Sequence, residues 1–151
     1  MPTPATRTPV LLAGLLVLAL LAAGCGRTGE ATVRFEQGRA ELEQLLDELV
    51  TASGLDVVDR EPFSTPQTCE LPTAADGAVS SASLRARVPE DVDVPAQASA
   101  VLVEAGYELT DEGLREGVFA RRAGMRITVE VDRAVDLVLI DASTGCRPVG
   151  G

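Results

Sequence analysis

The sequence predicts an α+β protein in which two helices pack on one face of a mainly antiparallel sheet of four or five strands. Two observations support this fold class: two segments repeat their apolar residues at helical spacing, and the segments after Gly106 alternate with a period of two. The predicted order is helix, strand, helix and then a meander, which is typical of helices packed on one side of a sheet. No internal repeat or second domain is evident, so a single domain is predicted over residues 32–149.

The first helix is predicted from about Thr32 to Ser53. Its acidic residues fall mostly between the apolar positions, which therefore form one stripe of an amphipathic helix. Gly54 suits the C-terminal cap, and Leu55 beyond it can make the hydrophobic contact that accompanies such caps. The stripe consists of Phe35, Leu42, Leu45, Leu46, Leu49 and Val50.

Residues 56–78 contain several prolines and few large apolar side chains, so we expect an irregular segment whose middle is pinned by Cys69. A strand is predicted over residues 78–88, because apolar and polar side chains alternate there. One face carries Ala82, Leu84, Ala86 and Val88, and the other carries Ser81, Ser83, Arg85 and Arg87.

The second helix is expected to begin at Asp91 or Asp93, either of which can cap it. Pro95 falls in its first turn, and Gly106 ends it. Its apolar stripe is Ala98, Val101, Leu102 and Ala105.

Four further strands are predicted after the second helix, over residues 107–110, 118–122, 125–131 and 137–142. Turn residues separate them, which favours an antiparallel meander. Residues 137–140 are apolar at every position, as expected of a strand in the centre of a sheet.

The N-terminus has the features of an export signal. Residues 10–23 form an uninterrupted apolar run of 14 residues that follows one positive side chain, Arg7. The run is short for a membrane-spanning helix, which needs about 20 residues. Small residues follow it, so residues 1–24 are predicted to be a signal peptide; an ordinary secretory signal or an uncleaved anchor are the alternatives.

The residues Leu21-Ala22-Ala23-Gly24-Cys25 resemble the lipobox of bacterial lipoproteins. The commonest form of that motif has Leu where this chain has Ala22. The resemblance implies cleavage before Cys25, a diacylglycerol on its sulfur and often a further acyl chain such as palmitate on its amino group. It also implies attachment to the extracytoplasmic face of the cell membrane through those acyl chains, with residues 25–31 forming the lipidated end and a short tether.

In outline, the whole chain also resembles small actinobacterial lipoproteins of unknown function. The likeness rests on Arg without any Lys and on richness in Ala, Gly and Val. It implies no activity.

The cysteines indicate the same compartment. If Cys25 is lipidated, Cys69 and Cys146 remain as a pair, and disulfides persist in exported proteins. We predict a structural disulfide, worth roughly 4 to 5 kcal/mol at most by loop entropy. A redox-active pair is the alternative, but such cysteines usually lie close together in sequence.

Composition excludes several functional classes. The formal net charge is −10 and the chain contains no His and no Trp. A nucleic-acid binder needs basic surface to neutralise phosphates, so no nucleic-acid partner is expected. The missing His rules out His-based triads and His metal ligands, and only 3% aromatic residues leave little for base or sugar stacking.

The side chains that could act in catalysis lack the sequence patterns of known catalytic or metal sites. The carboxylates Glu90, Asp91 and Asp93 lack the calcium-loop pattern and are interpreted as acids at a helix start, whereas Asp111 and Glu112 suit a polar hairpin loop. Three serines, Ser80, Ser81 and Ser83, lie on a predicted strand without a nucleophile elbow, and neither His nor Lys is available as a base. No catalytic residue, metal site or cofactor is predicted.

A group of four arginines has two interpretations, as an anion-binding patch or as a solvated strand face. Arg115, Arg121, Arg122 and Arg126 fall around one predicted hairpin. They could bind anions, or they could be a solvated strand face paired with acidic side chains.

The function expected from the sequence is that of a membrane-anchored extracytoplasmic lipoprotein, acting as a non-enzymatic binding or accessory module of the cell envelope with an unidentified envelope protein or ligand. The alternative is a small carboxylate-dependent envelope hydrolase. A hydrolase would gather at least two of the candidate carboxylates in one pocket with perturbed pKa values, whereas a binding module would leave them scattered and solvated.

Overall fold

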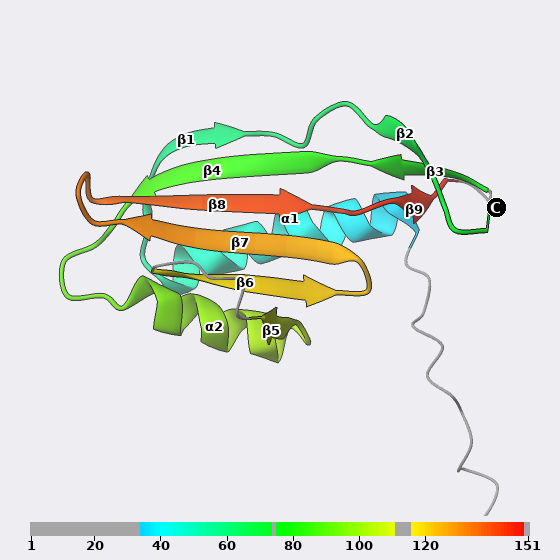
Figure 1. The fold of residues 1–151 in the computed structure, drawn as a ribbon. Helices are drawn as coiled ribbons and strands as arrows, with labels where there is room; N and C mark the ends of the chain where they lie inside the picture. Colours follow the sequence, from blue (N-terminus) through cyan, green and yellow to red (C-terminus); the bar gives the residue numbers. More distant parts are fainter. Residues whose placement is uncertain (1–33, 74, 111–115, 150–151) are drawn as a thin grey trace, which may run out of the picture. The chain divides into compact units, whose positions relative to one another are not determined.

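The computed structural model describes residues 34–73, 75–110 and 116–149. These belong to one compact unit, Thr32–Gly151, shown in Figure 1. The predicted signal peptide, Cys25 and the tether lie outside the described residues, as do Asp111, Glu112 and Arg115. Neither helix that the structure describes combines the length and the apolarity needed to cross a bilayer.

The described residues form an α+β fold with two helices, a six-stranded antiparallel sheet and a small three-stranded antiparallel sheet. The large sheet has the order β1 (Asp56–Glu61), β4 (Ser81–Arg87), β8 (Leu137–Ser143), β7 (Met125–Asp132), β6 (Gly117–Arg122) and β5 (Glu108–Thr110). The small sheet has the order β2 (Gln67–Glu70), β3 (Asp76–Val79) and β9 (Arg147–Pro148).

Helix α1 (Phe35–Ala52) buries most of the predicted apolar stripe, and Leu42 and Leu49 are fully buried. Gly54 has a φ of +59°, a left-handed conformation that glycine adopts without strain. This turn lets the Leu55 amide donate a 3.0 Å hydrogen bond to the Val50 carbonyl, so the predicted cap is present.

Helix α2 (Val94–Glu104) begins where a carboxylate caps it. The Asp93 side chain accepts a 3.1 Å hydrogen bond from the Ala96 amide, whereas Asp91 lies earlier in the loop with a φ of +61°. Of the two predicted caps, Asp93 is therefore the one used. Ala98 and Leu102 are buried as predicted.

The prediction that residues 56–78 are irregular is wrong, because β1, β2 and most of β3 lie there. Strand β1 is an edge strand exposed at every position, so it carries no alternating apolar pattern, and its pairing with β4 defines it instead. The large sheet therefore has six strands rather than four or five. Between the two helices, the three strands β1, β2 and β3 precede β4, where the prediction had a single strand.

The strand predicted over residues 78–88 is divided at Ser80 between the two sheets. The buried Ser80 accounts for this break, because its amide donates a 3.0 Å hydrogen bond to the Thr144 hydroxyl and its own hydroxyl donates to the Ser64 carbonyl at 2.6 Å. Side chains thus replace part of the strand ladder where the chain passes from β3 to β4.

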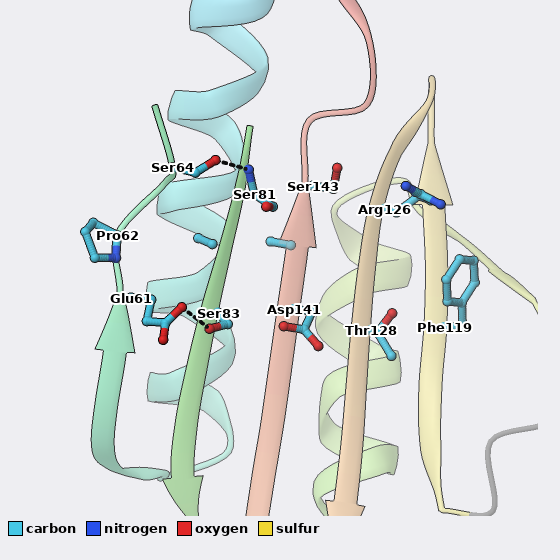
Figure 2. A pocket seen from close by; sticks show the side chains of 12 residues that line it. Glu61, Pro62, Ser64, Ser81, Ser83, Phe119, Arg126, Thr128, Asp141 and Ser143 are labelled. Carbon is cyan, nitrogen blue, oxygen red and sulfur yellow. Dashed lines mark hydrogen bonds between the residues drawn. The ribbon is translucent and has the colours of Figure 1, made fainter. Parts of the chain in front are cut away.

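Both helices contribute to one hydrophobic core on a single face of the large sheet. Every second residue of β4, β7 and β8 is buried on that face, as the alternation predicts. Figure 2 shows the helices behind the strands and the polar side chains on the opposite side. We call that opposite side the open face.

Strand β8 lies between β4 and β7, so its predicted central position is confirmed. Its apolar residues are nevertheless not equally buried. Val138 and Ile140 are in the core, whereas Leu137 and Leu139 are half-buried on the open face. No helix among the described residues covers this side, which explains the difference.

The predicted disulfide is present. Cys69 in β2 bonds to Cys146, which lies just before β9, and their Cα atoms are 6.0 Å apart. The bond therefore links the two outer strands of the small sheet, β2 and β9. Gly77 lies in β3 between the bonded strands, where an added Cβ would be 2.8 Å from the Cys146 sulfur and 3.2 Å from the Cys69 sulfur.

Candidate ligand-binding site on the open face

The open face contains a hollow of about 480 Å³, shown in Figure 2, which we call the open-face hollow. Its residues come from β1, β4, β6, β7 and β8 and from the segment that follows β1. They are Glu61, Pro62, Ser64, Ser81, Ala82, Ser83, Phe119, Arg126, Thr128, Asp141, Ala142 and Ser143.

The hollow exists because short side chains occupy neighbouring positions on three adjacent strands. Ser81 is opposite Ser143 across β4 and β8, and Ser83 is opposite Asp141. Asp141 is in turn opposite Thr128 on β7. Directly opposite side chains on one face are nearest neighbours, so these small hydroxyl residues leave a depression with hydrogen-bonding walls.

One wall is the segment after β1, and hydrogen bonds attach it to the start of β4. The Ser64 amide donates to the Ser81 carbonyl at 2.8 Å, and the Ser81 amide donates back to the Ser64 hydroxyl at 3.2 Å. Phe63 is buried beneath this wall, with the Arg39 guanidinium 5.7 Å from its ring centre. The wall is therefore anchored to both the sheet and α1.

The opposite wall carries the Phe119 ring from β6 and the Arg126 guanidinium from β7, both labelled in Figure 2. Phe119 is opposite Thr128, and Arg126 is opposite Ser143 on one side and Arg121 on the other. Among the described residues, the Arg126 side chain has no hydrogen bond or ion pair. Its charge is therefore available to a ligand.

Asp141 lies in the middle of the hollow. Burial raises the pKa of its carboxyl group, and the nearby carboxylates of Glu130 and Glu61 raise it further. No described side chain donates a hydrogen bond to the Asp141 carboxyl group. The Ser83 hydroxyl on the neighbouring strand donates to Glu61 instead, at 3.3 Å. This carboxyl can accept a hydrogen bond from a ligand when ionised and donate one when protonated.

The carboxylates singled out from the sequence are elsewhere. Glu90, Asp91 and Asp93 lie in the loop before α2, and none of them lines the open-face hollow. The structure instead brings together Glu61 and Asp141, which no motif in the sequence singles out. Their strands are separated by β4, so they meet only through strand pairing.

The described arginines of the predicted hairpin group do not form one patch. Arg121 and Arg126 are directly opposite on the open face. Arg122 points to the helix side, where it pairs with Glu41, donates to the Ala105 carbonyl at 2.6 Å and lies 5.0 Å from the Tyr107 ring centre. Its contacts hold the sheet against both helices. Of the two arginines on the open face, only Arg126 lines the open-face hollow.

A second groove, of about 650 Å³, lies between α1 and α2. The charged side chains along it are all acidic, namely Asp47, Glu48 and Glu104. Asp47 is already paired with Arg60 at 2.6 Å. The open-face hollow is smaller but holds both signs of charge together with hydroxyl groups and an aromatic ring, so it is the better candidate for selective recognition.

Within residues 34–73, 75–110 and 116–149, no three Cys, Asp or Glu side chains gather closely enough to hold a metal ion. Comparisons with protein-family models, curated proteins and solved structures found no match for this chain.

Proposed function

We propose that the protein is a lipid-anchored, extracytoplasmic binding module that holds its ligand in the open-face hollow. The observation that carries this proposal is a preformed depression lined by five hydroxyl side chains, with an unpaired guanidinium and an unpaired carboxyl among the described residues around it. Polar groups fixed on strands select a ligand by hydrogen bonding and charge.

The anchoring part of the proposal rests on the sequence. The lipobox-like residues ending at Cys25 supply an acylation site, and two or more acyl chains bind a membrane firmly. Residues 26–31 would span only about 20 Å when extended, so the domain would stay close to the membrane.

Anchoring is tested by metabolic labelling with a palmitate analogue in cells that express the full chain or its Cys25→Ala variant. We expect label on the original chain and none on the variant. Equal labelling of the two would overturn the lipoprotein assignment.

Ligand binding by the open face is tested with a photoreactive amino acid introduced into the full chain in intact cells. Ser83 in the hollow is one position, and Val103 on the exposed side of α2 is the matched control. We expect an adduct specific to the Ser83 position. No adduct there, or the same adduct at both positions, would contradict a ligand site on the open face.

A second function has one specific observation in its favour. Asp141 has a raised pKa in a hollow that also contains Glu61, so a hydrolase could use Asp141 as the acid that protonates the leaving group and Glu61 as the base that activates water. The supporting assay is hydrolysis of a cell-envelope polymer by the purified protein. Activity that Asp141→Asn abolishes and Asp132→Asn preserves would favour the hydrolase over the binding module.

A further inference from the structure

Two side chains of opposite charge line the open-face hollow without pairing. Asp141 is directly opposite Thr128, and Arg126 lies two residues before Thr128 on the same face of β7. Such diagonal neighbours have Cα atoms about 7–8 Å apart, within reach of a long side chain. In the described structure, however, Arg126 and Asp141 make no ion pair with each other or with another residue.

We propose, building on the binding function above, that the ligand is a short zwitterion such as a small peptide with free ends, whose carboxylate binds Arg126 and whose ammonium group binds Asp141. A planar guanidinium can hold a carboxylate through two parallel hydrogen bonds. A carboxylate such as that of Asp141 accepts hydrogen bonds from an ammonium group. The ligand thus completes two charge pairs that the described protein leaves open.

The surrounding charges argue against ligands of a single sign. Glu61 and Asp141 in the hollow, with Glu130 nearby, repel a simple anion. Arg126 and the adjacent Arg121 repel a simple cation. A molecule that carries both charges satisfies both ends of the hollow, because each end then faces its opposite.

The hydroxyl groups between the two charges suit the polar backbone of such a ligand. Ser143 is opposite Arg126, and Thr128 is opposite Asp141, so a hydroxyl stands beside each charged group. Hydroxyls both donate and accept hydrogen bonds, as a peptide group requires. A hollow of about 480 Å³ also accommodates a ligand of this size.

The test is an NMR titration of the ¹⁵N-labelled full chain in detergent with three small probes. Alanyl-alanine carries both charges, N-acetylalanine only the carboxylate, and alanine amide only the ammonium group. We expect alanyl-alanine to shift amide signals of residues 81–83, 126–128 and 141–143, and to bind at least about tenfold more tightly than either singly charged probe.

Charge-neutralising variants then assign the two ends. Arg126→Gln is expected to weaken alanyl-alanine binding about tenfold without weakening that of alanine amide, and Asp141→Asn to weaken it about tenfold without weakening that of N-acetylalanine. Arg126→Lys should restore part of the affinity. Arg85→Gln and Asp132→Asn make the same charge changes on the open face outside the hollow, so they serve as matched controls and should retain the original affinity.

Three results would overturn the zwitterion proposal: equal binding of N-acetylalanine and alanyl-alanine, shifts confined to another surface, or no shift with any probe. A dispersed spectrum of each variant shows that it folds. If the zwitterion test fails while the Ser83 adduct persists, the ligand class is wrong and the binding face stands. If the Ser83 adduct is also lost, the proposed function itself fails.

Discussion

Removing the Cys69–Cys146 disulfide tests how the small sheet is held together. The bonded residues are 77 positions apart, and the loop-entropy relation for that length gives about 4.5 kcal/mol at 25 °C as an upper value. Strand β2 has four residues, none of them buried, so few other interactions oppose its separation from β3. Strand β9 has two residues, of which the buried Arg147 also donates hydrogen bonds to the carbonyls of Thr144 and Ala123. We therefore expect most of that free energy to be lost in Cys69→Ala/Cys146→Ala.

The assay is equilibrium unfolding in urea with and without a reducing agent. Reductant should lower the unfolding midpoint of the original protein to that of the double variant and leave the variant unchanged. Hydrogen exchange adds a local measurement, because amides of β2 and β9 should lose protection before those of β7 and β8 at the sheet centre. A loss below about 1 kcal/mol with an unchanged m-value would refute the reasoning.

Three further outcomes follow from the structure. Gly77→Ala should lower the free energy of unfolding by about 1–3 kcal/mol, because its Cβ would press on the disulfide; thermal unfolding at wild-type stability would disprove this crowding. Tyr107 is the chain's single tyrosine, and burial raises its pKa to about 12. Its ultraviolet absorbance should therefore show ionisation near that pH. A titration midpoint at the usual 10.0 in the folded protein would contradict the burial of its ring. Asp141→Asn should be more stable than the original protein near neutral pH. A carboxyl group whose pKa is raised on folding stabilises the folded state at low pH, and this contribution is lost as the pH rises through its folded pKa. The difference should vanish below the unfolded pKa of about 3.9, and an equal gain at both pH values would point to another cause.

The local elements could be predicted from the sequence because their signals are local. The apolar stripe, the Gly54 turn and the Asp93 cap define the two helices within a few residues of the chain. Alternation similarly locates β6, β7 and β8, where one side is buried. The pairing of Cys69 with Cys146 could also be predicted, because the resemblance of residues 21–25 to a lipobox implies a separate role for Cys25.

The sequence pattern of β6 does assign Arg121 and Arg122 to opposite faces of the sheet, although the two were first grouped as one cluster. Arg121 and Arg122 are consecutive in β6, and successive side chains of a strand point to opposite faces. Alternation alone therefore separates them. It assigns Arg122 to the side packed on the helices and Arg121 to the open face, as the structure shows.

Composition and local pattern by themselves determined the elements with a buried face, the disulfide partners and the absence of His-based chemistry. Only the tertiary structure decided where β1 pairs, since an edge strand exposed on both faces leaves no periodic trace. It also decided the site, because Glu61 and Asp141 lie 80 positions apart and their proximity depends on the register of both with Ser83. Register is set by packing and hydrogen bonding between distant segments, so no local window of the sequence contains it.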